Sequence, residues 1–158
     1  MDEEIRKYLE AADDPIGILF PGNEPARFPL ETYQGEVAAI QERLRQELGL
    51  QTDMDNEVKG AAFFAELMFC SPEANPPRRD LVRINIQFSN FGKLATIWTS
   101  NEASSNIFPL SKIESILKDQ GWIPIPMQAL DEAYNGANAE FYKRGGSWYA
   151  RFFEYSGY

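Results

Sequence analysis

The sequence contains no histidine, and Cys70 is the one cysteine among its 158 residues. Without an imidazole the chain cannot build Ser-His-Asp or Cys-His catalysis in the usual form, because the base in such sites titrates near neutral pH. It also lacks the ligands of common zinc sites and cannot form an intramolecular disulfide. We therefore expect no metal, no cofactor and no standard enzyme chemistry.

Long hydrophobic runs are also missing. The longest apolar stretch, residues 61–70, is interrupted by Glu66 and is much shorter than the roughly 20 residues that cross a bilayer. Residues 2–10 carry acids where a secretory signal needs a basic start. No glycine-rich phosphate loop, dinucleotide fingerprint or nucleophile elbow is present. These absences predict a cytoplasmic protein.

Positive charge is scarce in one part of the chain. Residues 1–58 hold 14 acidic and 5 basic residues, whereas residues 59–158 hold 10 of each, so the first part carries the whole net charge of −9. A negative field repels phosphate backbones and anionic lipids, which argues against nucleic-acid and membrane-surface binding. It favours a basic protein partner, with solubility alone as the simpler explanation.

The pattern of elements predicts one domain over residues 1–158, with an acidic helical part, 1–58, and a sheet-forming part, 59–158. In the first part, Asp2 can cap a helix that ends near Asp13. A second helix over residues 33–48 is indicated by an apolar stripe at helical spacing, made of Val37, Ile40, Leu44 and Leu48.

The second part contains the predicted strands. Residues 61–70 are apolar on both alternating faces, which favours a central strand, although a buried helix remains an alternative. Residues 82–88 alternate strictly, and a turn over residues 89–92 predicts a hairpin with residues 93–99. A final strand is expected over residues 148–155.

Helices are expected between these strands. A capping box of Ser111 and Glu114 predicts a helix through residue 120, after which Trp122 packs back on its last turn. Pro126 suits the start of a short helix reaching Tyr134. The predicted fold class is α+β, with an antiparallel sheet of four or five strands and helices packed mainly on one face.

Two acidic features of the sequence are candidate sites. Asp53, Asp55 and Glu57 resemble the start of a calcium loop. Such a loop needs glycine at its sixth position and glutamate at its twelfth, and here these positions hold Val58 and Phe64. A solvated acidic turn before a strand is the expectation here.

Glu66 interrupts a strand that should be buried, so it needs a partner or an outward position. We expect an ion pair with Arg83 or Arg151. An outward-facing side chain and a general acid or base remain as alternatives.

The strongest candidate surface combines Trp98 with the aromatic carboxy-terminal segment. If Trp148, Ala150 and Phe152 of this final strand face the protein core, the other side chains of the strand line the opposite face of the sheet. This face is the predicted binding site, and it consists of Tyr149, Arg151, Phe153 and Tyr155, extended by Arg83, Asn85 and Gln87. Burial of both sheet faces and pairing in a homodimer are the alternatives.

Together these observations favour a non-enzymatic protein-binding domain with a basic protein partner. Immunity proteins and adaptors share this size, charge and architecture, but no motif identifies a family. The alternatives are a small-ligand or carboxylate-based hydrolytic site between sheet and helices, and a self-associating structural protein.

Overall fold

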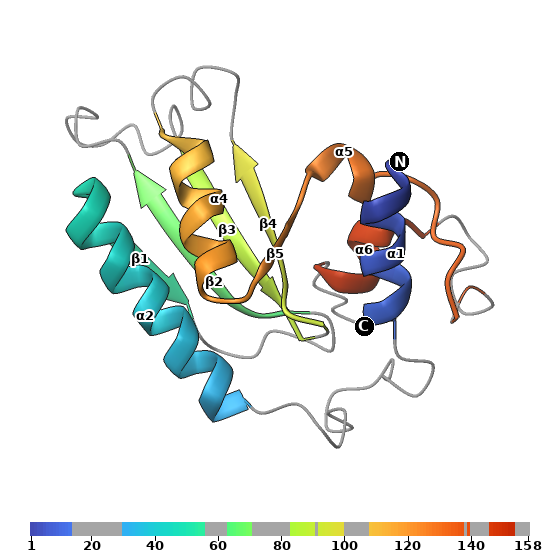
Figure 1. The fold of residues 1–158 in the computed structure, drawn as a ribbon, viewed down its shortest axis with the longest axis horizontal. Coiled ribbons are helices and arrows are strands. Elements are labelled where there is room, and N and C mark those ends of the chain that lie inside the picture. The colour runs from blue at the N-terminus through green and yellow to red at the C-terminus, as the bar shows by residue number, and fades with distance from the viewer. Residues whose placement is uncertain are drawn as a thin grey trace.

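A computed structural model describes residues 1–13, 30–55, 63–70, 83–90, 92–99, 108–137, 139 and 146–153 (Figure 1). Five strands form one sheet in the order of the sequence: β1 (Thr52–Asp55), β2 (Phe63–Cys70), β3 (Arg83–Ser89), β4 (Leu94–Thr99) and β5 (Ile123–Ile125). The first four are antiparallel, and β5 is parallel to β4. The predicted α+β class with a mostly antiparallel sheet is confirmed.

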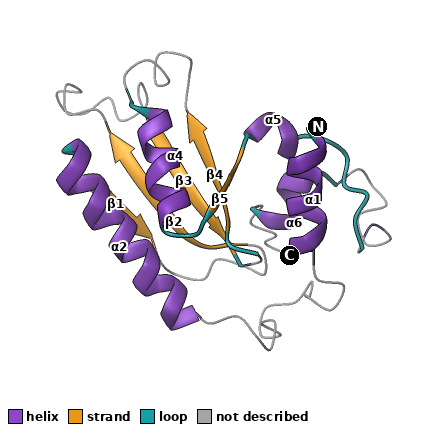
Figure 2. Cartoon of the chain, in the orientation of Figure 1, coloured by secondary structure: helices purple, strands orange, loops and turns teal. Residues whose placement is uncertain are grey.

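One face of the sheet is covered by α2 (Leu30–Leu48) and α4 (Leu110–Asp119), as Figures 1 and 2 show. The predicted stripe of α2 is buried, with Val37, Ile40 and Leu44 fully inaccessible to solvent. It belongs to one buried cluster with the alternate strand residues on this face of the sheet, which are Ala65, Leu67, Phe69, Ile84, Ile86, Phe88 and Ala95. None of the described helices is both long and apolar enough to cross a bilayer.

The central hairpin confirms the strand predictions. Residues 63–70 are a strand and not a buried helix, and β3 and β4 are joined by the predicted turn. In that turn Gly92 and Lys93 both have positive φ, at 65° and 54°. A Cβ at Gly92 would collide with Ala12, so glycine is required both by the conformation and by the close approach of the first helix.

The two outer strands were not predicted. β1 replaces the expected acidic turn, so the sheet begins inside the segment predicted to be helical. Both outer strands discourage edge-to-edge pairing with another sheet, because β1 is four residues long with two aspartates and β5 contains Pro124.

The start of α4 differs from its prediction, whereas its end agrees. Pro109 is the N-cap, and Ser111 lies inside the helix, so the expected capping box is wrong. At the other end Gly121 adopts φ 77°, and the Trp122 N–H donates to the Leu117 carbonyl at 3.0 Å. This is a Schellman motif, and it places the Trp122 ring in the core, where it is 1% exposed.

A second hydrophobic cluster lies beyond β4 and β5. The sequence pattern did not distinguish it from the main core. This second cluster is built by α1 (Glu3–Ala12), α5 (Met127–Leu130) and α6 (Trp148–Phe152), which Figure 1 shows together on one side of the sheet. Its buried members are Leu9, Leu94, Ile125, Ala129, Leu130, Tyr134, Trp148, Phe152 and Phe153.

Two predicted elements in this region are wrong. Residues 148–152 form a helix and not a strand, because the Ser147 side chain caps it by accepting the Ala150 N–H at 3.2 Å. α5 stops at Leu130 and does not reach Tyr134. The chain beyond it forms backbone hydrogen bonds with the start of α6 and the residues just before it. The Tyr134 N–H donates to the Gly146 carbonyl, and the Trp148 N–H donates to the Glu132 carbonyl.

The Asp13 carboxylate connects the two ends of this cluster. One oxygen accepts Arg151 Nε at 2.7 Å, and the other accepts the Tyr134 hydroxyl at 2.5 Å and the Ala137 N–H at 2.6 Å. The Asp13 and Arg151 side chains are only 1% and 4% exposed. A Cβ at Gly136 would collide with this carboxylate, so the turn at Asn135-Gly136 closes tightly over it.

Removing one member of this buried pair should be strongly destabilising, because the other charge is left buried without its counter-ion. We expect Asp13→Ala and Arg151→Met each to lower the free energy of unfolding by about 3–5 kcal/mol, and the double variant to cost less than the sum of the two. Urea unfolding of the four proteins measures this coupling. Asp119→Asn, at an exposed ion pair, is the control and should leave the midpoint near that of the parent; additive single costs would contradict the coupling.

Candidate functional site

The carboxy-terminal residues predicted to form a binding face lie mostly inside the molecule. Arg151 is held by Asp13, and Phe153 is fully buried in the second cluster. Tyr149 is half-buried, and its hydroxyl donates to Gln87 Oε1 at 3.0 Å. Tyr155 lies outside the described residues. The predicted face on a final strand is therefore not formed, because the segment is helical and directs Trp148, Arg151 and Phe152 inward together.

The predicted residues on β3 lie on the sheet face opposite α2 and α4. Strand pairing places their neighbours in two rows across four strands. The first row is Asp53, Met68, Asn85 and Trp98, and the second is Asp55, Glu66, Gln87 and Thr96. We call these eight residues the polar sheet face. Arg83, the third predicted residue of β3, starts that strand opposite Cys70, and its side chain is outside the description.

The polar sheet face is accessible over most of its width. Asp53 and Trp98 are exposed, and the residues between them are half-buried. At the Thr96 end of β4 the face is closed by the second cluster, because Thr96 is fully buried and donates to the Ile125 carbonyl at 3.0 Å. The hydrogen bond from Tyr149 to Gln87 marks the border between the open and covered parts.

Glu66 is bound by an amide. Asn85 Nδ2 donates to Glu66 Oε1 at 2.8 Å, which links the two rows diagonally. The expected pair with Arg151 is wrong, because Arg151 is turned toward Asp13 in the second cluster. The alternative ion pair, between Glu66 and Arg83, stays a prediction, because the Arg83 side chain is not among those that the structure describes. Asn85 Oδ1 is buried and has no hydrogen-bond partner among the described residues, so this amide is satisfied on one side only.

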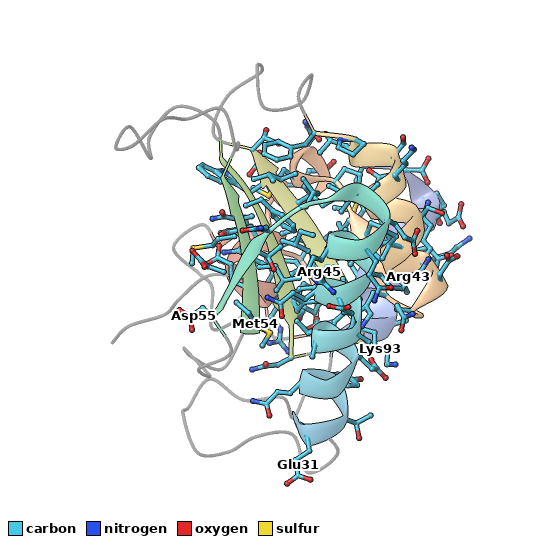
Figure 3. The ribbon with its side chains drawn as sticks, turned by 90° about the vertical axis from the view of Figure 1, so that its left-hand side faces the viewer. Glu31, Arg43, Arg45, Met54, Asp55 and Lys93 are labelled. Carbon is cyan, nitrogen blue, oxygen red and sulfur yellow. The ribbon has the colours of Figure 1, made fainter. Side chains whose placement is uncertain are left out.

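The charge of the polar sheet face is negative. Asp53, Asp55 and Glu66 stand on the adjacent strands β1 and β2, and neither row contains a lysine or arginine. Figure 3 shows Asp55 at the end of β1, on the side of the sheet away from α2. These carboxylates make an acidic area at the β1 and β2 end of the face, and the exposed Trp98 ring lies at its other end, on β4.

Three of the four acids of α2 differ from these, because they form ion pairs: Glu42 and Glu47 with arginines of the same helix, and Glu36 with Lys93. Arg45 binds Glu42, and Arg43 binds Glu47 and also Asp119 of α4. The hydrogen bond from Arg45 lowers the pKa of Glu42, and the bonds to Glu47 and Asp119 raise the pKa of Arg43. The negative excess of the first third of the chain is therefore not concentrated on this helix.

Possible metal ligands and the acids that line cavities are both sparse in the described part of the chain. No three potential ligands among the described residues lie close enough to hold a metal ion. Two cavities, of about 540 and 420 Å³, lie over β5, and each is lined by one carboxylate, Glu114 in the first and Glu4 in the second. Neither brings two acids together.

Comparisons with known proteins do not add a family or a fold relative: neither the protein-family models, nor the curated proteins, nor the solved structures contain a match to this chain.

Sequence reasoning found Asn85, Gln87 and Trp98 but did not join them to Asp53 and Asp55. The signal was present, since Asp53 and Asp55 alternate with Met54, which packs against the core. Alternation of acid and apolar residues is typical of an edge strand with one wet face. The superficial likeness to a calcium loop concealed it.

Accessibility of this face can be measured through Trp98. The other two tryptophans, Trp122 and Trp148, are each 1% exposed, whereas Trp98 is 40% exposed. We expect acrylamide to quench the parent protein's fluorescence through Trp98, and Trp98→Phe to lower the quenching constant several-fold. Trp148→Phe is the matched control and should leave the accessible component unchanged. Equal quenching in the parent and Trp98→Phe would contradict an open face.

Proposed function

We propose that this chain is a non-enzymatic protein-binding domain, of the immunity or adaptor type, whose polar sheet face binds a basic protein partner. The observation that supports it is the accessible sheet face that carries Asp53, Asp55 and Glu66 on β1 and β2 and the exposed Trp98 on β4. A single cysteine fits a reducing compartment, and we infer that the partner is met in the cytoplasm.

Each part of the face contributes a different term to binding. An aromatic ring such as Trp98 supplies a large contact area at low cost in conformational entropy, which is why tryptophan is enriched at binding hot spots. The carboxylates steer a basic partner and raise the association rate more than the final affinity.

The size of the face indicates that it is the centre of a larger interface. Four strands spaced at about 4.8 Å give a width of about 15–20 Å, and two rows of side chains cover a few hundred Å². A stable interface buries about 800 Å² on each partner. A partner that covers the face therefore also contacts neighbouring residues, which act as its rim.

The experiment compares four forms of the full chain in affinity capture from native lysate at low salt, with quantification by mass spectrometry: the parent, two variants of the face and one matched control. The face variant is Asp53→Asn/Asp55→Asn/Glu66→Gln, and the aromatic variant is Trp98→Ala. The amount of a basic protein captured should be at least about tenfold lower with the face variant than with the parent. Its rate of association with the parent should fall steeply with added salt.

The matched control removes three negative charges elsewhere: Glu3→Gln/Glu31→Gln/Glu47→Gln, on the exposed sides of α1 and α2. It should capture the partner as well as the parent does. Loss of capture in the control to the same extent would show that net charge alone is responsible and would reject the face. Capture that is independent of salt and of all three face carboxylates would reject the basic partner.

A further inference from the structure

A groove runs over β5, between α1 and α4. The cavity of about 540 Å³ is lined by Trp98, Glu114 and Met127 among others, and the cavity of about 420 Å³ by Glu4 and Tyr8 among others. They share three lining residues, Ile5, Lys118 and Pro124, so they form one continuous depression. Figure 1 shows β5 crossing between α4 on one side and the α1 and α5 helices on the other.

Both exposed large hydrophobic side chains of the described chain line this groove. Tyr8 is 38% exposed and belongs to the smaller cavity, and Trp98 is 40% exposed and belongs to the larger one. Single exposed apolar residues are ordinary, but here two partly exposed aromatic rings lie in the two parts of one groove, where both can contact the same partner.

The floor of the groove cannot accept an added strand. Ile123 N–H donates to the Lys93 carbonyl of the turn before β4, so Ile123 and Ile125 direct their backbone groups toward β4. The residue between them, Pro124, faces the open edge and has no N–H to donate. A segment lying here must therefore bind through side chains and cannot depend on a backbone ladder.

The walls of the groove carry opposed acidic groups. Glu4 stands on α1 and Glu114 on α4, with Lys118 as the one base of the lining, so the lining has a net charge of −1. Glu4 Oε1 accepts the Tyr8 hydroxyl at 3.0 Å, which fixes the ring at the groove edge. The same bond is the main cause of the raised pKa of Tyr8.

We propose that this groove binds an extended, proline-containing segment of the partner that carries a lysine or arginine beside its prolines. The proposal rests on the proposed function, because it adds a second contact for the same basic partner. A polyproline helix has no internal hydrogen bonds and needs no ladder, which fits an edge closed by Pro124. Its rings pack on aromatic side chains, and its cation is attracted both by carboxylates and by the faces of Trp98 and Tyr8.

The test selects ligands from a displayed library of random twelve-residue peptides against the full chain. Enriched peptides should contain prolines in the spacing of a polyproline helix and at least one adjacent lysine or arginine. Two of them, made synthetically, should bind with an affinity that falls at least about fivefold in Tyr8→Ala and also falls in Glu114→Gln. Glu10→Gln, on an exposed position of α1 outside the groove lining, is the matched control and should bind like the parent.

Several results would overturn the proposal. Enrichment of amphipathic helical peptides, or of none above background, would exclude a polyproline-type occupant. Binding that survives Tyr8→Ala but is lost in Asp53→Asn/Asp55→Asn/Glu66→Gln would place the peptides on the polar sheet face, which rejects the groove and leaves the proposed function standing. Concentration-dependent self-association in light scattering that Tyr8→Ala abolishes would show that a second copy occupies the groove.

Discussion

The buried Asp13 carboxylate determines how the two ends of the chain are arranged. Its oxygens bind Arg151, Tyr134 and Ala137, which are more than 120 residues away in sequence. Because α1 has one fully buried apolar residue, Leu9, hydrophobic burial alone fixes this helix weakly. The polar network supplies the orientation, and through it α1 becomes a wall of the groove over β5.

The sheet separates two kinds of surface. On one side α2 and α4 cover alternate strand residues and form the main core. On the other side the same strands present Asp53, Glu66 and Asn85, and the second cluster covers only the part near β4 and β5. Trp98 lies where the open face and the groove meet, since it belongs to the first row of the face and lines the larger cavity. The two proposed contacts are therefore neighbouring parts of one binding surface.

The candidate site was only partly predictable. Alternation identified β3, and with it the shared face of Asn85 and Gln87, because period two is a local property of the chain. The same reasoning failed for residues 148–152, where five apolar or amphipathic residues in a row satisfy both a strand and a short helix. Ser147, placed after two glycines, was the signal for a helix start, and its cap bond decides the structure. Burial of Arg151 followed from Asp13, a partner no local pattern could indicate.

The sequence by itself determined the α+β class, the long α2 helix, the β3–β4 hairpin, the Schellman end of α4 and the absence of histidine chemistry. Each depends on residues within a few positions of one another, or on composition. Only the tertiary structure decided that Asp53 and Asp55 lie beside Glu66, that β5 runs parallel to β4, and that Tyr8 and Trp98 line one groove. These relations depend on contacts between distant segments, whose free energies come from packing and buried polar bonds and leave no period in the sequence.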